Sequence, residues 1–295
     1  MTSVSLAPAS ASFANRRLGR RPAIAYLIGA LCVGVAALMA APIVLSFLAS
    51  IKTAADASAA PPHYLPGMLS YENYAKVFNY QAGLAKYVGN SALVALITIV
   101  ASLAIAAPAG YGLARFQMRG KEIAFLVLLA PIMIPYQALL TPLYLDFAKI
   151  GLVNTHLGLA IVHTILQLPF SIYLMRSSFE AIPREVEEAA IMDGCSSWSR
   201  LVHVFLPLTI PGLVTLALFA LINSWNEFLA ALIFMNNETS FTVPILIVNV
   251  RTEKLGAVDW GALQASVIIS IIPCLVVYLL LQRYYISGLL SGAVK

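Results

Sequence analysis

Residues 88–114 read VGNSALVALITIVASLAIAAPAGYGLA and contain no Asp, Glu, Lys or Arg. A helix rises 1.5 Å per residue, so an apolar run of this length can cross a hydrocarbon core about 30 Å thick. Five further apolar runs occur, at about residues 23–50, 122–145, 157–176, 206–234 and 261–282. The sequence therefore predicts an all-α, polytopic membrane protein with about six transmembrane helices.

The composition supports this class and excludes several others. Residues of the types AVILMFWYC make up 60% of the 295 positions and charged residues only 11%, against about 45–50% and about 25% in soluble domains. A mean hydropathy of +0.86 also excludes a disordered chain. The net charge of +5 is expected where Lys and Arg flank membrane spans, so it does not indicate nucleic-acid binding. The three cysteines are far apart, which argues against a disulfide framework or a cysteine metal site.

The first apolar run allows a second interpretation. Basic residues precede it and Ala-rich positions follow it, as in a signal peptide, but it is longer than the 7–15 residues of a signal-peptide core. Residues 1–22 are rich in Ser and Ala, contain four Arg and no acid, and so also resemble an organelle transit peptide. We interpret the run as a retained span and residues 1–22 as a basic cytoplasmic tail.

The distribution of basic residues predicts the orientation. Twelve of the 18 Lys and Arg residues fall on one side of the six runs and six on the other. The positive-inside rule therefore places both termini and the loops at about 115–121 and 177–205 in the cytoplasm. The loops near 51–87, 146–156 and 235–260 then face outward. The prediction divides the chain into a tail at 1–22, a six-helix domain at 23–286 and a second cytoplasmic tail at 287–295.

The most charged segment lies between the fourth and fifth runs, where residues 182–194 read IPREVEEAAIMDG. Pro183 suits the first turn of a helix, and Glu185 favours the positive end of the helix dipole. Gly194 can then end that helix in a left-handed conformation. Ser196 or Ser197 can cap a second short helix at 198–204. These features predict a helix–turn–helix on the cytoplasmic face.

This loop has the composition of a docking surface. Ala189 and Ala190 would let the backbone of another protein approach closely, and Glu187 and Glu188 could meet its basic groups. The alternative is an interfacial helix that only connects two spans, although such helices usually carry Lys or Arg on the polar face. The residue types alone leave both readings open.

The spacing of residues in this loop resembles the EAA loop of permease subunits of ATP-binding-cassette importers. The matching positions are Glu188, Ala189, Ala190, Asp193, Gly194, Val204, Leu206 and Pro207. Val204 is a departure, because the motif more often has isoleucine there. The loop as a whole covers about residues 181–207.

Other segments resemble the carbohydrate branch of these importers, the maltose-type inner-membrane permeases. The segments are YGLARF at 111–116 with GK at 120–121, TPLY at 141–144, NTHLGL at 154–159, NSWNEFL at 223–229, DWGAL at 259–263 and GLLSGAVK at 288–295. The likeness covers nearly everything after residue 23.

The resemblance implies a function and a set of partners. The first helix of the loop would be a coupling helix seated in a groove of an ATPase subunit. Glu188 would pair with a basic residue there, Ala189 and Ala190 would form the contact face, and Gly194 would set the angle to the second helix. The partners implied are a second, homologous permease, two ATPase subunits, an extracytoplasmic solute-binding protein and a sugar or sugar-like solute. The location implied is the bacterial inner (plasma) membrane.

No enzymatic role or cofactor is expected of this chain. The sequence contains no G-x-x-x-x-G-K-[ST] loop, so ATP and Mg²⁺ are expected to bind to the separate ATPase. The four histidines lack the H-E-x-x-H spacing of a zinc protease, and no G-x-S-x-G elbow is present. We therefore predict no catalytic residues and no metal site.

Polar residues within the fifth run form a second candidate site. Asn223, Asn226 and Glu227 surround Trp225, where an unpaired acid would cost about 2.5–3.5 kcal/mol on insertion scales. These four side chains could line a sugar path, or they could hold this subunit against its neighbour through interhelical hydrogen bonds.

The same two readings apply to three polar residues of the third and fourth runs, Gln137, His163 and Gln167. Four prolines in these two runs predict bends or breaks: Pro131, Pro135, Pro142 and Pro169. The alternative function is an ion-gradient-driven secondary transporter or channel subunit. That class usually buries several ionisable groups in the membrane, and Glu227 is the only clear one in this sequence.

Overall fold

The computed structural model describes residues 22–251 and 258–293, with side chains at 24–251 and 258–282. Within these ranges every regular element is a helix and no strand occurs, which confirms the all-α prediction. The predicted tail before Pro22 lies outside the described residues. The described residues divide into two units, the first ending at Leu45 and the second beginning at Ser46. The first contains most of helix α1 (Pro22–Ser50), and both candidate sites lie in the second.

Within the described ranges, four helices are long and apolar enough to cross a membrane. They are α1, α4 (Leu84–Arg115), α7 (His156–Glu180) and α14 (Trp260–Ala293). Two bent pairs of helices pass the same test, so six candidate spans result if each pair counts as one. Helix α14 continues to Ala293, so the separate tail predicted from residue 287 begins as an extension of this helix.

The third predicted span, at 122–145, is broken, as the prolines of this run predict. Helix α5 (Lys121–Leu129) and the 3-10 turn η1 (Ala130–Met133) precede α6 (Tyr136–Lys149), and the two parts are bent by 98°. Pro131 and Pro135 lie at this break, as expected of residues that lack a backbone donor. Pro142 and Pro169, by contrast, lie inside α6 and α7 without ending them.

The fifth predicted span, at 206–234, also divides. A one-turn helix α9 (Ser197–Ser199), a π-helical segment η2 (Arg200–Phe205) and α10 (Leu206–Leu208) lead into α11 (Ile210–Asn226) through a bend of 79°. Pro207 and Pro211 flank this bend and remove two helical donors. A second break at Glu227 and Phe228 separates α11 from α12 (Leu229–Phe234).

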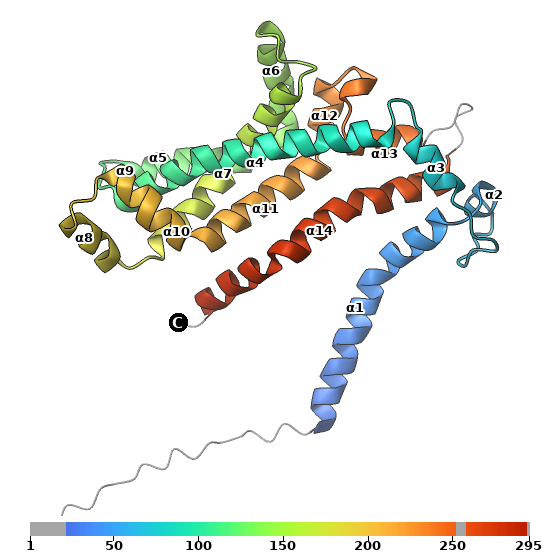
Figure 1. Ribbon diagram of the computed structural model, residues 1–295, viewed down its shortest axis with the longest axis horizontal. Helices are drawn as coiled ribbons and strands as arrows, with labels where there is room; N and C mark the ends of the chain where they lie inside the picture. Colours follow the sequence, from blue (N-terminus) through green and yellow to red (C-terminus); the bar gives the residue numbers. More distant parts are fainter. Residues whose placement is uncertain (1–21, 252–257, 294–295) are drawn as a thin grey trace, which may run out of the picture. The chain divides into compact units, whose positions relative to one another are not determined.

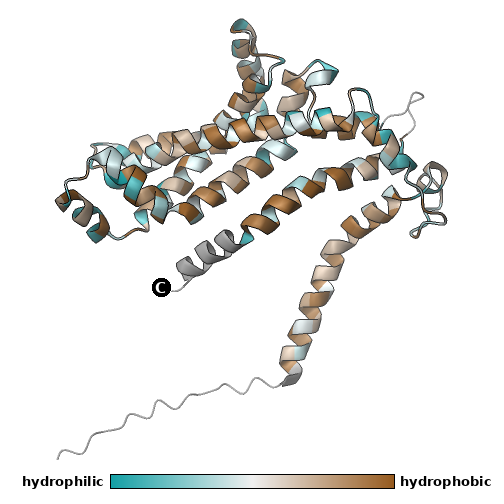
Figure 2. Ribbon diagram, in the orientation of Figure 1, coloured by the Kyte–Doolittle hydropathy of each residue, from teal (hydrophilic) through white to brown (hydrophobic). Residues whose placement is uncertain are grey.

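In the second unit, α4, α7 and α11 run side by side and α14 packs against α11 (Figure 1). The α4–α7 contact depends on small residues, because Gly110 lies so close to α7 that a Cβ atom would come within 2.7 Å of the Met175 Cβ. Within a bilayer the hydrophobic effect does not drive helices together, because lipid tails are as apolar as the side chains. Close packing of this kind then provides the attraction between helices. Brown, apolar residues cover much of these helices in Figure 2, as expected of surfaces that meet lipid or another apolar subunit.

Short elements complete the second unit. Two of them, α2 (Ala54–Ala57) and α3 (Glu72–Phe78), lie in the loop predicted to face outward. The other two, η3 (Glu238–Ser240) and α13 (Val243–Val250), follow α12. The charged loop with α8 (Arg184–Met192) lies at one end of the long helices, and α12 and α13 lie toward the other (Figure 1).

Candidate functional site

The helix of the charged loop has the boundaries that its sequence predicts. Helix α8 begins after Pro183, which is the N-cap residue and so lies one position before the predicted first turn. The backbone of Gly194 is left-handed, with a φ of +76°. The N–H of Cys195 donates to the Ala190 carbonyl (3.0 Å) and that of Gly194 donates to the Ile191 carbonyl (2.9 Å). This pair of bonds is a Schellman motif, so the predicted left-handed stop at Gly194 is confirmed.

The second helix of the loop also starts as predicted. The hydroxyl of Ser196 accepts a hydrogen bond from the Ser199 N–H at 3.2 Å and caps α9. Leu206 and Pro207 then form α10, where Leu206 is half-buried and Pro207 is exposed. The charged segment is therefore a helix–turn–helix, with a π-helical second arm.

Fewer residues of α8 are exposed than the sequence predicts. Glu188, Ala189 and Asp193 are exposed, and Met192 is 86% exposed. Ala190 is only 6% exposed, because it faces the rest of the chain. Ala189 and Ala190 therefore differ, because Ala189 is exposed and Ala190 packs against the chain itself.

Glu187 belongs to the inner side of the helix as well. Its Oε2 atom lies 3.6 Å from Nη1 of Arg115 in the same chain. The basic group that Glu187 meets in this structure is thus internal. Glu188, in contrast, forms no ion pair with any described residue, so its negative charge remains available on the outer face.

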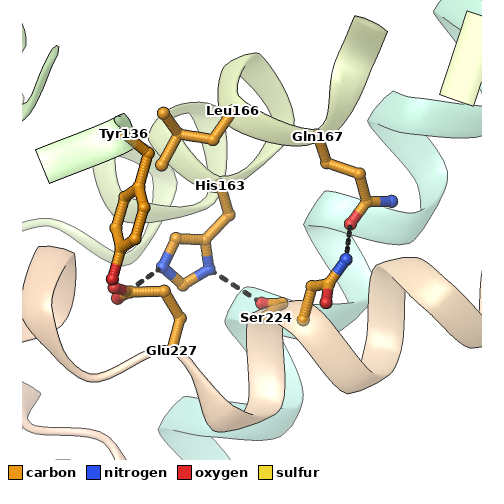
Figure 3. A pocket seen from close by; sticks show the side chains of 7 residues that line it. Tyr136, His163, Leu166, Gln167, Ser224 and Glu227 are labelled. Carbon is orange, nitrogen blue, oxygen red and sulfur yellow. Dashed lines mark hydrogen bonds and ion pairs between the residues drawn. The ribbon is translucent and has the colours of Figure 1, made fainter. Parts of the chain in front are cut away.

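The second site is a cavity of about 280 Å³ between α6, α7 and the end of α11 (Figure 3). Its lining consists of Tyr136, His163, Leu166, Gln167, Asn223, Ser224 and Glu227. His163 and Gln167 are one helical turn apart on α7 and are almost fully buried, whereas Asn223 is exposed. The cavity therefore has polar walls within a segment of otherwise apolar helices.

The centre of this wall is a chain of three polar side chains. Nδ1 of His163 lies 2.9 Å from the Ser224 hydroxyl, and Nε2 lies 3.4 Å from Oε2 of Glu227. Figure 3 shows the imidazole between these two partners. The charge of Glu227 is therefore accommodated by a buried polar partner, as an acid within a membrane requires.

Glu227 also determines the local backbone. Its carboxylate accepts hydrogen bonds from the Ala230 N–H (2.8 Å) and the Ala231 N–H (3.0 Å). These donors belong to the first turn of α12, which has no other partners for them. Glu227 therefore stabilises the break between α11 and α12 and fixes the position of its own carboxylate at the cavity.

A pair of amides forms another part of the lining. Nδ2 of Asn223 donates to Oε1 of Gln167 at 3.3 Å. Each amide retains further donor or acceptor capacity. Together with Tyr136 and Glu227, they offer the mixture of donors and acceptors that hydroxyl groups bind.

The four candidate path residues of the sequence separate into two groups. Asn223 and Glu227 line the cavity. Trp225 is 4% exposed, and its Nε1 donates to the Ser270 carbonyl of α14 at 3.1 Å, so its role is packing. Asn226 is exposed and donates to the Ile222 carbonyl at 2.8 Å, away from the cavity. Trp225 and Asn226 therefore lie outside the cavity lining, and the contact of Trp225 with α14 corresponds to the packing alternative.

The residues of the third and fourth runs divide in the same way. His163 and Gln167 line the cavity, and Gln137 does not. Tyr136 was missed, although its position directly after Pro135, at a predicted break, could have indicated it. No three His, Cys, Asp or Glu side chains lie close enough to hold a metal ion anywhere in the described part of the chain.

These features define a helical membrane protein with a protruding loop and a polar cavity. Residues 106–289 match the family described as "Binding-protein-dependent transport system inner membrane component", and the chain belongs to this family. It is thus the membrane component of an importer, and ATP hydrolysis belongs to a separate subunit. Both candidate sites lie within the matched residues.

Two curated relatives illustrate the likeness. The probable ABC transporter permease protein YurM of Bacillus subtilis is 37% identical over 231 residues, which cover 78% of this chain and 76% of that protein. The trehalose/maltose transport system permease protein MalG of Thermococcus litoralis is 32% identical over 225 residues, covering 76% and 81%.

A solved structure shares the fold. It is the crystal structure of a bacterial ABC transporter involved in the import of the acidic polysaccharide alginate. One of its chains aligns with a TM-score of 0.76 and 25% identity, covering 90% of this chain and 98% of that one. The helices described above therefore follow the architecture of a membrane subunit of an importer.

Proposed function

We propose that this chain forms half of the membrane pathway of a carbohydrate importer and receives the driving force through the exposed face of α8. The observation that carries the proposal is the division of α8 into two sides. Glu188, Ala189 and Met192 are exposed to a partner, while Ala190 and Glu187 are held by the chain itself. A helix that is anchored to its own chain on one side and exposed on the other can transmit a movement of a second protein to the rest of the chain.

The proposed partner on this face is an ATPase subunit that binds ATP and Mg²⁺. Glu188 would meet a basic group of the ATPase, and Ala189 would allow close backbone contact. Closure of two ATPase subunits would move α8 and the attached helices, and thereby open the pathway alternately to the two sides of the membrane. This assignment requires the loop, and with it both termini, to lie in the cytoplasm.

A second, homologous permease is the proposed neighbour within the membrane. Asn223 and Asn226 are exposed on α11 in the single chain. Polar side chains in a span normally face other helices or a water-filled cavity. A partner permease over this face would enclose them, and the polar cavity would then open toward the space between the two subunits. An extracytoplasmic solute-binding protein would deliver the cargo.

The cargo proposed is a sugar or sugar-like solute. The cavity offers amides, a phenol, a hydroxyl and a carboxylate, a combination suited to hydroxyl groups. Named relatives support the same class, among them the sulfoquinovosyl glycerol permease SmoH of Agrobacterium fabrum, which is 32% identical over 254 residues, 86% of this chain and 88% of that protein.

Purification of the tagged chain from its native membrane tests the function. We expect a P-loop ATPase, a second permease and a binding protein to copurify, and we expect the binding protein to hold a sugar that mass spectrometry can identify. Sugar uptake into proteoliposomes should then require ATP and persist when ion gradients are collapsed. If the chain purifies without an ATPase and its uptake follows an ion gradient, it is a secondary transporter and the proposal is wrong.

A further inference from the structure

Arg115 is the last residue of α4, and its side chain is only 6% exposed. Its Nη2 group donates to the Ile182 carbonyl at 2.6 Å and to the Phe179 carbonyl. Phe179 belongs to the last turn of α7, and Ile182 lies in the short link between α7 and α8. The guanidinium thus joins the ends of α4 and α7.

The same guanidinium also contacts both arms of the docking loop. Nη1 lies 3.6 Å from Oε2 of Glu187 on α8, and Cζ lies 4.8 Å from the centre of the Phe205 ring in η2. One side chain therefore touches four segments: α4, the end of α7, the docking helix and the π-helical arm that follows it. Arginine suits this role because its five donors form a rigid, planar fork.

Aromatic rings enclose this contact. The ring of Tyr111 lies 5.8 Å from that of Phe179 and 5.1 Å from that of Phe205, measured between ring centres. All three residues are at most 3% exposed. Burial strengthens the charged contacts of Arg115 and limits its freedom to change rotamer.

We propose that Arg115 is the positioning residue that makes α8 move together with α4 and α7. This inference rests on the proposed function, because it supposes that an ATPase pushes on α8. Helix α7 carries His163 and Gln167 of the cavity. The contacts of Arg115 therefore provide the mechanical connection between the loop that receives the push and a helix that lines the cavity.

The test compares two arginine variants of the complete complex in proteoliposomes. Arg115→Gln removes the charge and the fork but keeps a polar side chain of intermediate length. We expect ATP hydrolysis to continue while sugar uptake per ATP falls about tenfold, within the range typical of coupling between sites. Arg115→Lys should recover only part of the ratio, because an ammonium group cannot span both carbonyls and Glu187.

Arg176 provides the matched control. It is also mostly buried, at 11% exposed, and binds Glu122 at 2.7 and 2.9 Å and Glu180 at 2.8 Å. Its guanidinium lies 4.1 Å from the Phe125 ring. These contacts join α5 to α7, and none of them involves a residue of α8. Arg176→Gln should therefore lower the melting temperature of the complex without changing uptake per ATP.

Glu187→Gln is the second variant, and it decides the outcome if Arg115→Gln fails to assemble. It removes only the link to α8, so uptake per ATP should fall by a smaller factor. In the double variant the two effects should not add, because both act through one contact. Unchanged uptake per ATP in the assembled Arg115 and Glu187 variants would overturn the inference. A wild-type chain that purifies without an ATPase would instead contradict the proposed function.

Discussion

The Nε2 atom of His163 lies 3.4 Å from Oε2 of Glu227, so a side chain from the middle of α7 meets the acid that ends α11. The same carboxylate accepts two backbone hydrogen bonds from α12. The acid therefore has a structural role at the helix break and a place in the cavity wall.

Glu227→Gln removes the charge of this side chain and leaves its volume almost unchanged, so it tests the contribution of the carboxylate itself. The amide oxygen can accept from one of the two α12 donors, while the amide nitrogen cannot accept from the other, and the negative charge opposite His163 is lost. Hydrogen bonds to a charged group contribute about 1.5–3 kcal/mol, so we expect the purified complex to melt several degrees earlier. Thermal unfolding followed by light scattering or fluorescence measures this change. The exposed Glu185→Gln is the control, and equal melting temperatures for both variants would show that Glu227 does not stabilise the break.

The cavity predicts different effects at two neighbouring asparagines. Asn223→Ala removes a lining amide and the hydrogen bond that it donates to Oε1 of Gln167, whereas Asn226 lies outside the lining. Uptake should therefore fall in the Asn223 variant, and ATP hydrolysis stimulated by the binding protein should continue. The Asn226→Ala variant should retain most of its uptake. If both variants lose the same amount of uptake and the complex has a lower melting temperature, α11 has only a packing role.

A third prediction concerns Gly194, the residue with left-handed backbone that follows α8. Gly194→Val places a β-branched side chain at a φ of +76°, which costs about 1–2 kcal/mol for residues with a Cβ atom. We expect uptake to fall because the angle between α8 and α9 changes, although no neighbouring atom lies within 4 Å of the position of a Cβ. Gly194→Asn should be tolerated better, since Asn adopts this conformation more readily. Uptake assays compare these variants with Gly89→Ala, a helical glycine that also has open space around it. If the Gly194→Val variant takes up sugar at the wild-type rate, the loop has no part in the coupling mechanism.

A pH prediction concerns the loop between α1 and α4. The Gly67 N–H and the His63 ring, which lie 3.2 and 3.0 Å from the Asp56 carboxylate, hold the pKa of Asp56 below its ordinary value of 3.8. A carboxyl group whose pKa is lowered by folding stabilises the folded loop above pH 3.8, and this contribution is lost as the pH falls through the lowered value. Hydrogen exchange at the Gly67 amide, corrected for the intrinsic rate, should therefore accelerate only when the pH falls below 3.8.

The Asp56→Asn variant should lose this acid dependence, since the amide does not titrate. Asp146→Asn serves as the control, because Asp146 pairs with Lys149 in an exposed position elsewhere. An Asp56→Asn protein with the same acceleration at low pH would show that another group is responsible.

Much of the fold could be predicted because lipid imposes a simple rule on composition. An apolar run long enough to cross the bilayer forms a helix, since no water is present to satisfy the backbone. The runs that became α4 and α7 illustrate this. Hydropathy does not distinguish a straight span from a broken one, so the break at Pro135 was indicated only by its prolines and the interruption at Glu227 was not indicated.

The helix boundaries in the charged loop could be predicted from local chemistry alone. Pro183, Gly194 and Ser196 act on their immediate neighbours, so their positions determined where α8 and α9 begin and end. The side of α8 that each residue faces depends on contacts with distant segments. The sequence could not indicate that Arg115 would meet Glu187, because the two residues are brought together only by the packing of α4 against α7.

The cavity was predictable only in part for the same reason. Polar residues in a span indicate a site or an interhelical contact, but their direction depends on helix rotation. Asn223 and Asn226 differ by less than one helical turn, yet only Asn223 lies in the lining. Trp225 turns toward Ser270 of α14, a contact that no local pattern indicates.

Photo-crosslinking from α8 tests the central claim most directly. A photoreactive amino acid at Met192, which is 86% exposed beside Glu188 and Ala189, should capture the ATPase subunit in the assembled importer. The same amino acid at Ser70, in the loop predicted to face outward, should not capture it. A product that contains the P-loop subunit from Met192 alone is the result that the account predicts. Capture of the ATPase from Ser70, or none from Met192 in a complex that still transports, would contradict it.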